Sequence, residues 1–451
     1  MADLLSIILA AGDGTRMRSA MPKVLHPVGG LSMVGHTIRT VQAAGSSSIA
    51  VVVGPGHDAV AAIVASMAPE ATMFEQSQRL GTAHAVKQAR AAYETAQGNV
   101  LVLYADTPLV TPATIAGITA RLDAGADIVV VGFEPEDPTG YGRLLTEGGR
   151  LLAIREHRDA TYAEREIGLV NSGIIGFKGT ALRAVIERIG NANAKGEFYL
   201  TDAVELANRD KMQVAYTKAD AREVIGVDDR RKLAEAETQF QELRRDDFMK
   251  AGVTLKDPSS VYFSYDTEIG PDTLIEPNVV FGPGVKIGQG VKVFAFSHIT
   301  ETSLGDRVEV GPFVRLRGKT VLADDVHLGN FVEAKNARIA AGSKAMHLSY
   351  LGDTVIGSKT NVGAGTITCN YDGVNKTQTT IGDNVFVGSN SSLVAPVSIG
   401  DRAYVASGSV ITEDVPAEAL AFGRARQENK LGYAPKLREK ALAKKAAKGK
   451  S

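Results

Sequence analysis

A six-residue period dominates the C-terminal half of the chain. An aliphatic residue stands first, glycine usually stands second, and a small or β-branched residue stands fifth. Such a hexapeptide period is the signature of a parallel β-helix, whose interior is filled by the first residue and whose turn is permitted by glycine. We therefore predict a β-helix domain over residues 251–435. Its copies begin at Ile269, Ile275, Phe281, Ile287, Leu304, Val310, Leu328, Ile356, Val362, Ile381, Val387 and Ile399.

The repeat is interrupted once, between Thr368 and Thr380. An excursion from a solenoid is a common place for functional residues, because it is free of the packing that the repeat imposes. It follows His347 within two coils, so we expect Asn370 and Tyr371 to lie close to that histidine.

The N-terminal residues 1–228 follow a different pattern, in which short apolar runs alternate with helix-like stretches. Unbroken Val, Ile and Leu strands separated by helices predict a Rossmann-like α/β domain with a mostly parallel sheet covered on both faces. Ligands of such sheets bind at the carboxyl ends of the strands. The expected strands are 5–9, 49–53, 100–103, 128–131 and 174–177, and the expected helices are 33–44, 83–96 and 111–124.

Two further segments complete the organisation. Residues 229–250 contain neither glycine nor proline and place apolar residues at near-helical spacing, which predicts an amphipathic linker helix. Residues 436–451 hold seven Lys and Arg against one Glu, and we expect a solvated, disordered basic tail.

Composition excludes several classes of function. The formal net charge of −1 over 451 residues gives no reason to expect a nucleic-acid or membrane partner. Cys369 is the single cysteine, so an intramolecular disulfide and a cysteine zinc cluster are both impossible. The start of the chain lacks the basic region of a signal peptide, and no apolar run is long enough to span a membrane. We expect a cytoplasmic protein.

A glycine-rich loop, from Leu9 to Met17, follows the first expected strand. Gly12 and Gly14 permit a phosphate to approach the backbone N–H groups closely. A plain strand-to-helix turn is the alternative. Met17 occupies the place of the third glycine of a dinucleotide fingerprint, and the Gly-Lys-Ser/Thr of a Walker loop is absent.

Charged residues near this loop favour a triphosphate ligand. Arg16 and Lys23 are two cations suited to a pyrophosphate leaving group. Asp106 ends a buried strand at the ligand edge, where a carboxylate can hold Mg²⁺. Alternatively, Asp106 merely caps the helix that follows.

These motifs resemble the signature of the sugar-phosphate nucleotidyltransferases. With the repeat domain attached, nearly the whole chain resembles the bifunctional N-acetylglucosamine-1-phosphate uridylyltransferase/glucosamine-1-phosphate acetyltransferase family. The matching segments are Leu9–Met17, Pro22-Lys23, Gln76, Leu80–Thr82, Tyr104–Asp106, Gly140–Arg143, Glu156 and Asn171–Gly173.

The resemblance implies synthesis of UDP-N-acetylglucosamine, a cell-wall and lipopolysaccharide precursor. Glucosamine 1-phosphate is first acetylated from acetyl-CoA by the C-terminal domain, and UMP is then transferred from UTP by the N-terminal domain. It also implies Mg²⁺ as cofactor, a homotrimer formed through the β-helix, and left-handed coiling of that helix.

The resemblance also assigns residues in the N-terminal domain. Asp106 and Asp228 would bind Mg²⁺, and Asp228 departs from the asparagine usual in the family, so it adds a negative charge that tightens metal binding or recruits a second ion. Glu156, Gly142 and Asn171 would hold the sugar. The expected nucleotide contacts are Leu9, Ala10, Ala11, Gly12, Lys23, Gln76, Gly81 and Thr82.

In the C-terminal domain, acyl transfer to an amine needs a base with a pKa near neutrality, and His347 suits that task. A plain surface histidine is the alternative. The resemblance makes His347 the base, Arg317, Lys335, Tyr350 and Asn361 the sugar-phosphate contacts, and Ala364, Asn370, Tyr371, Ser389, Ser407 and Arg424 the acetyl-CoA contacts. Ser407 stands where the family has alanine, and Ser389 serves either the tetrahedral oxyanion or only its coil corner.

Two rival hypotheses remain open from the sequence. In the first, the repeat domain only regulates or oligomerises a nucleotidyltransferase, as in ADP-glucose pyrophosphorylases. In the second, both domains only bind, and the chain is an assembly scaffold. His347 and the excursion argue against the first, and Arg16, Lys23 and Asp106 argue against the second.

Overall fold

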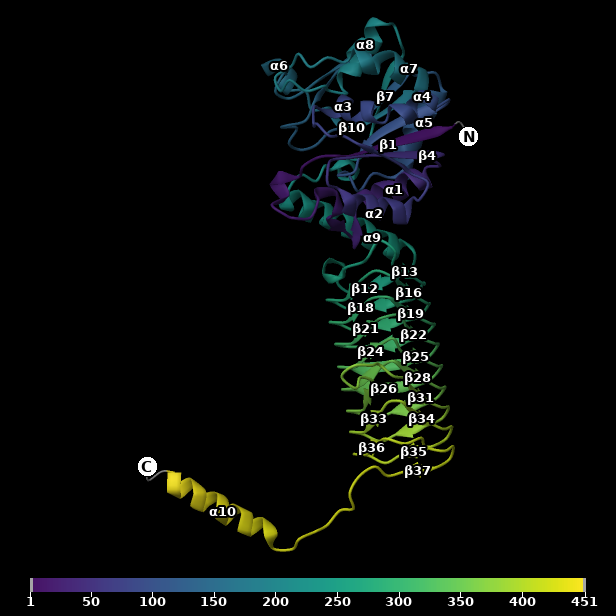
Figure 1. The fold of residues 1–451 in the computed structure, drawn as a ribbon, viewed down its shortest axis with the longest axis vertical. Coiled ribbons are helices and arrows are strands. Elements are labelled where there is room, and N and C mark those ends of the chain that lie inside the picture. The colour runs from purple at the N-terminus through teal and green to yellow at the C-terminus, as the bar shows by residue number, and fades with distance from the viewer. Residues whose placement is uncertain (1–2, 449–451) are drawn as a thin grey trace. The chain divides into compact units, whose positions relative to one another are not determined.

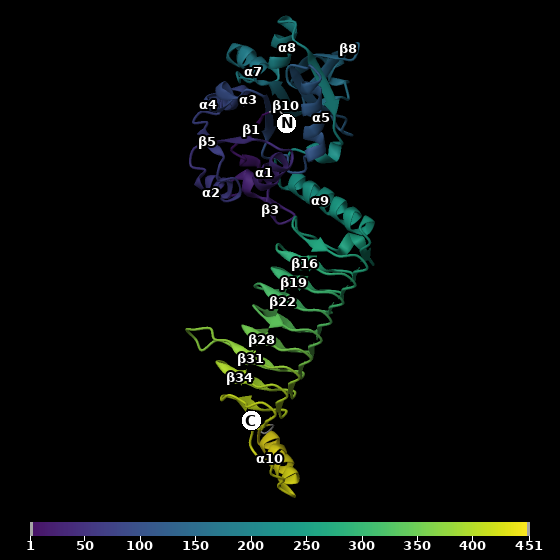
Figure 2. The same ribbon diagram turned by 90° about the vertical axis from the view of Figure 1, so that its right-hand side faces the viewer.

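The computed structural model describes residues 3–448 of the chain. The chain divides into two compact units. The first contains residues 1–251 and 261–267, and the second contains residues 252–260 and 268–451. Figure 1 shows both units as ribbons, and Figure 2 shows them from the side.

The first unit is built on a mixed sheet with the strand order β11-β7-β10-β6-β1-β4-β5. All neighbouring strands on this path pair in parallel except β10, which runs antiparallel to β6 and β7. The carboxyl ends of the other strands therefore share one edge of the sheet with the start of β10. The strands are β1 (Leu4–Ala10), β4 (Ser48–Val53), β5 (Thr72–Glu75), β6 (Asn99–Tyr104), β7 (Ile128–Phe133), β10 (Val170–Lys178) and β11 (Val214–Lys218).

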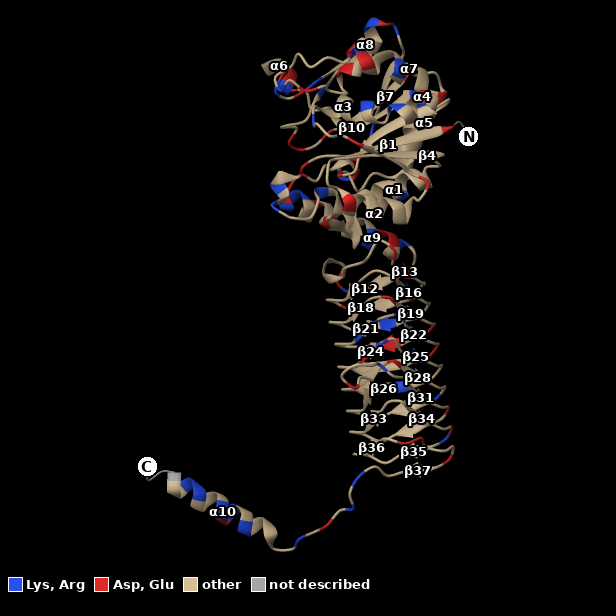
Figure 3. Cartoon of the chain, in the orientation of Figure 1, with Lys and Arg blue, Asp and Glu red and all other residues tan. Residues whose placement is uncertain are grey.

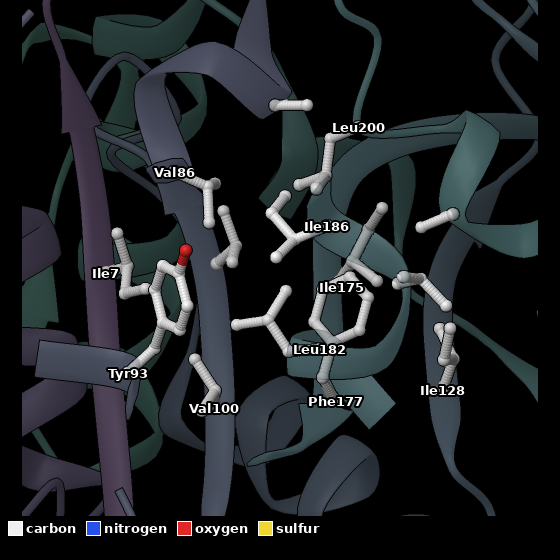
Figure 4. Packing of buried hydrophobic residues seen from close by; sticks show 14 of the residues in the cluster. Ile7, Val86, Tyr93, Val100, Ile128, Ile175, Phe177, Leu182, Ile186 and Leu200 are labelled. Atoms are coloured by element: carbon white, nitrogen blue, oxygen red, sulfur yellow. The ribbon is translucent and has the colours of Figure 1, made fainter. Parts of the chain in front are cut away.

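Two hydrophobic cores cover the two faces of this sheet, as the unbroken apolar strands predict. Along β1, Ile7 and Leu9 belong to one core and Ile8 to the other, because successive side chains of a strand point to opposite faces. Figure 4 shows the first core, where Ile7 and Val100 from the sheet pack with Tyr93. The helices of the two layers include α1 (Met33–Ala43), α2 (Asp58–Met67), α5 (Pro112–Asp123), α7 (Gly179–Val185) and α8 (Asp202–Arg209).

One expected helix is divided in the structure. Residues 83–96 form two helices, α3 (Thr82–Gln88) and α4 (Arg90–Thr95), instead of one. Ala89 between them has a ψ of 22° and is fully buried. Neither glycine nor proline marks the break, so the packing of Ala89 into the core overrides the helix propensity of the segment.

The linker segment forms α9 (Arg230–Lys250), whose N-cap is Asp229. This confirms the predicted helix, and α9 packs within the first unit. Phe240 lies in a small core with Val28 and Met33. Gly29 permits this contact, because a Cβ there would lie 2.2 Å from the Phe240 ring.

The second unit is a parallel β-helix, as the hexapeptide period predicts, and its coiling is left-handed, as the family resemblance implies. Apart from the end pairs β12–β14 and β35–β37, each strand pairs in parallel with the strand three places later, which gives three long sheets and one coil for every three strands. The first residues of the repeats fill the interior: Ile275, Phe281 and Val310 are all buried. The stacked coils are visible in Figure 1 from β12 (Thr254–Leu255) to β37 (Leu420–Ala421).

The basic C-terminal segment differs from the expectation of disorder. Residues Tyr433–Lys448 form α10, and the side chains described in it are exposed. Figure 3 shows its Lys and Arg residues in blue. Alanine, leucine, lysine and arginine are strong helix formers, so local propensity supplies a helix where no packing is available. Within residues 3–448, no helix combines the length and apolarity needed to cross a bilayer.

Candidate functional sites

The glycine-rich loop after β1 allows Lys23 to lie at the carboxyl edge of the sheet. Gly14 has a φ of +60°, and a Cβ there would lie 2.5 Å from Cβ of Lys23. Glycine is therefore required for Lys23 to pass this close to the loop. The Lys23 ammonium lies 2.5 Å from Asp106 Oδ2 and 3.4 Å from Asp228 Oδ1. Burial lowers the pKa of Lys23, but the two carboxylates outweigh burial, and the net pKa is raised.

Asp228 is surrounded by several cationic side chains. Its carboxylate is 3.0 Å from Arg16 and 3.9 Å from Lys232 of α9, in addition to Lys23. The backbone N–H of Val227 donates to the carbonyl of Asp106 at 2.9 Å, which holds the two aspartates together. The additional negative charge that Asp228 carries is thus balanced by neighbouring cations.

Two cavities meet at this cluster. The first has a volume of about 270 Å³ and includes Lys23 and Asp106 in its wall. It brings together all the residues expected to contact the nucleotide: Leu9, Ala10, Ala11, Gly12, Lys23, Gln76, Gly81 and Thr82. The second has a volume of about 590 Å³ and includes Arg16, Glu156 and Asp228. Lys23 therefore stands between the two, because it contacts one aspartate from each wall.

The segment after β5 is shaped by one glycine. Gly81 has a φ of +111°, and a Cβ there would lie 2.6 Å from the carbonyl oxygen of Phe198. Its own carbonyl accepts a hydrogen bond from Gln76 Nε2 at 3.1 Å, which fixes the buried Gln76 amide in the cavity. Thr82 begins α3, and its hydroxyl accepts from the backbone N–H of Leu200 at 2.9 Å.

Of the residues expected to hold the sugar, Glu156 lines the second cavity. Burial raises the pKa of Glu156, and a hydrogen bond of 3.2 Å from the Thr201 hydroxyl opposes that shift in part. Gly142 leaves the space beside Glu156 free, since a Cβ there would lie 3.4 Å from Oε1. The backbone N–H of Asn171, at the start of β10, donates to the carbonyl of Gly142 at 2.8 Å.

Sequence reasoning missed Arg79, which lines the first cavity. Arg79 donates from Nε to the carbonyl of Ala11 at 2.6 Å and pairs with Asp13 at 2.7 Å. It thereby ties the segment after β5 to the glycine loop. Its position between Gln76 and Thr82, two expected nucleotide contacts, is the sequence signal that could have identified it.

In the β-helix, a column of expected residues runs down one corner. His347 ends β26 (Lys344–His347), and its Nδ1 lies 2.9 Å from Oδ1 of Asn330, its register partner in β23 (His327–Asn330). Ala364, Ser389 and Ser407 occupy the same corner of the following coils. Backbone bonds join these coils from Gly365 to His347, Asn390 to Ala364, and Gly408 to Ser389. Arg424 lies beside Gly408 at the end of the column.

The expected sugar-phosphate cations lie on the sheet that begins at this corner. Arg317 of β21 (Arg315–Arg317) and Lys335 of β24 (Glu333–Lys335) are register partners. The Tyr350 hydroxyl lies close to Gly352, the register partner of Lys335, where a Cβ would be 2.4 Å from it. Asn361 of β29 (Asn361–Val362) stands apart, because it belongs to the sheet on the other side of the corner.

The excursion adds a cation that sequence reasoning missed. Figure 2 shows a loop that projects beside β28 (Thr354–Ile356) and β31 (Thr379–Ile381). Tyr371 and Lys376 form an antiparallel bridge within it. The Lys376 ammonium, within hydrogen-bonding reach of Lys335 and of like charge, lowers the pKa of Lys335. Two adjacent ammonium groups favour an anionic ligand.

The expectation that Asn370 and Tyr371 lie beside His347 is wrong within one chain. The excursion leaves the coil after β30 (Ile367–Cys369), which pairs with β27 (Tyr350–Gly352). His347 precedes β27, whereas the excursion follows β30, so they occupy opposite ends of the same sheet. The Asn370 amide instead donates to the carboxylate of Asp353. Proximity in coil number does not fix which corner a residue occupies.

Comparison with known proteins agrees with this division. Residues 6–166 match the MobA-like NTP transferase domain, and residues 266–301 and 378–413 match the bacterial transferase hexapeptide (six repeats). The Bifunctional protein GlmU of Azorhizobium caulinodans is 53% identical over 96% of this chain and 97% of its own. That of Agrobacterium fabrum is 52% identical over 99% of both chains. That of Bartonella quintana is 47% identical over 97% of this chain and 98% of its own.

The fold and the two sites define a nucleotidyltransferase joined to a hexapeptide acyltransferase. With relatives this similar over nearly its whole length, the chain belongs to the bifunctional protein GlmU family. This confirms the uridylyltransferase/acetyltransferase family that the sequence motifs indicate. The chain is a bifunctional enzyme that catalyses uridylyl transfer and acetylation, with a nucleotide and acetyl-CoA as co-substrates.

Proposed function

We propose that the chain makes UDP-N-acetylglucosamine in two steps, of which the β-helix catalyses the first. The acetylated product, N-acetylglucosamine 1-phosphate, is then the substrate of the first unit. The observation that carries the proposal is the position of Lys23, which contacts Asp106 and Asp228 where two cavities meet. That arrangement suits a nucleotide in one cavity and a sugar phosphate in the other.

In the uridylyl step, the phosphate oxygen of the sugar attacks the α-phosphorus of UTP, and pyrophosphate leaves. Arg16 and Lys23 would neutralise the charge on the triphosphate, and the walls of the two cavities would hold the reactants in line. Asp106 and Asp228 would hold Mg²⁺, whose charge when bound adds to that of the two cations. The pair fits such an ion, because Mg²⁺ is commonly bound through one or two carboxylates plus substrate phosphates.

In the acetyl step, His347 would take a proton from the 2-amino group of glucosamine 1-phosphate. The amine nitrogen then bonds to the thioester carbon of acetyl-CoA, and the CoA thiolate leaves and receives a proton. Ser389 lies two coils from His347, which is about 10 Å at the usual strand spacing. A reacting carbon between them is within reach of both side chains, so Ser389 is proposed to stabilise the oxyanion.

The width of the sheet that contains β27 would set the orientation of glucosamine 1-phosphate. His347 lies just before β27, and the cation set lies at the far end of this sheet, which the excursion adjoins. A strand of three residues spans about 10 Å, close to the length of a sugar with an amine at one end and a phosphate at the other. Arg317, Lys335 and Lys376 would bind the phosphate while His347 faces the amine.

We further propose that the β-helix functions as a homotrimer. The expected acetyl-CoA contacts lie at two different corners of one chain, so a single copy does not gather them. An aromatic ladder of Phe296, Phe313 and Phe331 runs along the His347 corner, with ring centroids 5.0 and 5.1 Å apart. Each ring is about half exposed, and such an apolar stripe is typical of an interface.

The cytoplasm is the proposed location, because UTP and acetyl-CoA are available there and a single cysteine leaves no intrachain disulfide to stabilise an exported fold.

The proposal is tested by incubating the full chain with glucosamine 1-phosphate, acetyl-CoA, UTP and Mg²⁺, and detecting UDP-N-acetylglucosamine by mass. Without acetyl-CoA, little nucleotide sugar should form. His347→Ala should abolish acetyl transfer and leave uridylyl transfer to N-acetylglucosamine 1-phosphate near normal, and Asp106→Ala should do the reverse. Loss of both activities in either variant would contradict two separate sites, and an H347A variant with normal acetyl transfer would remove the base assignment.

A further inference from the structure

Asn330 is placed against His347 by more than one contact. Its side-chain Oδ1 lies 2.9 Å from Nδ1 of the imidazole, and its carbonyl accepts from the backbone N–H of Leu348 at 3.0 Å. Gly329, the preceding residue, brings the two strands together, because a Cβ there would lie 1.9 Å from the carbonyl oxygen of Met346. The side chain of Asn330 is therefore held opposite the imidazole by the stacking of the coils.

This contact decides which nitrogen of the imidazole is basic. A neutral imidazole carries one proton, and the nitrogen without it is the base. Asn330 Oδ1 is only an acceptor, so it fixes the proton on Nδ1 and leaves Nε2 free to accept one. We infer that Asn330 is a positioning residue for acetyl transfer, which holds His347 in the tautomer and orientation that the 2-amino group requires. The inference rests on the proposed role of His347 as base.

The neutral amide also has an electrostatic consequence. A carboxylate at the same place would stabilise the imidazolium and keep His347 protonated to higher pH, which would remove the free base. An amide orients the ring without that effect. The structure thus gives the histidine a partner of no net charge.

The charged groups near His347 either pair with other residues or lie at the opposite ends of their strands. On β23, the titratable side chain is His327, at the opposite end of the strand, and on β26 it is Lys344. On the following coil, Asn361 and Ala364 are uncharged. Around the corner, Glu333 pairs with Arg317 at 2.7 Å, and Tyr350 of β27 carries a phenol group. Within residues 3–448, no ion pair involves His347.

The test compares wild type with Asn330→Ala and Asn330→Asp in the full chain, by following acetyl transfer from acetyl-CoA to glucosamine 1-phosphate between pH 5.5 and 9. N330A should lower kcat by about 10- to 100-fold, as for other groups that orient a functional histidine. The KM of each substrate should change by less than about twofold, because such a group affects the reacting base and not uniform binding. N330D should recover most of the rate at alkaline pH, and its acidic limb should move upward by about one pH unit.

Two controls make the result decisive. His327→Ala should leave the acidic limb in place, which shows that His327 is not the titrating group, and uridylyl transfer should be unchanged in all three variants. If N330A retains acetyl transfer within about threefold of wild type, or N330D leaves the limb unmoved, the inference is wrong. An inactive H347A variant beside silent Asn330 variants would overturn this inference alone, whereas an active H347A variant would overturn the base assignment and this inference together.

Discussion

The ammonium of Lys23 lies 2.5 Å from the carboxylate of Asp106, although the two residues come from separate loops at the edge of the sheet. Asp106 follows β6 directly, whereas Lys23 reaches the same place only because the loop after β1 bends at Gly14. The contact therefore depends on both the parallel pairing of β1 with β6 and one left-handed glycine.

Replacement of Lys23 should lower only the uridylyl-transfer activity. Lys23→Met should lower uridylyl transfer by about 10²- to 10³-fold, the usual cost of removing one group that stabilises developing charge. Acetyl transfer should be unchanged, because Lys23 belongs to the other unit. Pyrophosphate release and CoA release measured on the same preparation check this. Equal losses in the two assays would indicate unfolding instead of a local effect.

Alanine substitutions at Gly14 and at Gly12 should have different effects on the stability of the first unit. Gly14→Ala places a methyl group 2.5 Å from Lys23 at a φ of +60°, so it should lower the stability of the first unit by about 1–3 kcal/mol and impair uridylyl transfer. Gly12→Ala is the matched control, since a Cβ there meets nothing within 4 Å. Its melting temperature should equal that of wild type. A G14A variant as stable as G12A would contradict the stated packing.

The aspartate at position 228 should tolerate removal of its charge. Asp228→Asn keeps an oxygen ligand but loses the ion pairs with Arg16 and Lys23, so Mg²⁺-dependent uridylyl transfer should persist within about tenfold. The Mg²⁺ concentration at half-maximal rate should rise, because one negative charge is lost. Titration of the rate with MgCl₂ measures this. A variant as inactive as D106A would show that the charge itself is essential.

The buried carboxyl of Glu156 should make stability depend on pH. Burial raises its pKa in the folded state, so the protonated form is favoured there and the ionised form costs stability above the pKa. Glu156→Gln should therefore be more stable than wild type at pH 8, by about 2 °C for each kcal/mol of relief. The difference should vanish at acidic pH, where wild type is protonated. Thermal melts at pH 4 and pH 8 test this, and an equal difference at both would contradict it.

The aromatic ladder should control assembly. Phe313→Glu places a charge between Phe296 and Phe331 and should convert the proposed trimer to smaller species, as measured by light scattering. Acetyl transfer should fall with assembly, while uridylyl transfer persists. Tyr162→Glu is a control, because Tyr162 is 84% exposed and belongs to the other unit. A trimeric F313E variant would show that the ladder does not form the interface.

Much of the architecture is predictable from local pattern. The hexapeptide period demands a coil whose interior receives each sixth residue, and Ile275, Phe281 and Val310 are buried accordingly. The break at Ala89 and the helix at Tyr433–Lys448 were not predicted. In the first case buried packing overrides propensity, and in the second propensity acts without packing.

The chemical type of the functional side chains could be predicted from the sequence, whereas their grouping in space could not. Residue type and spacing marked Lys23, Asp106 and His347 as chemical groups, because a loop after a strand and a break in a repeat are visible in one dimension. Only the tertiary structure brought Asp228 beside Lys23, opposed Asn330 to His347, and separated Asn370 from that histidine. These relationships depend on strand register and on the corner that each residue occupies, and both are decided when distant coils and strands pack together.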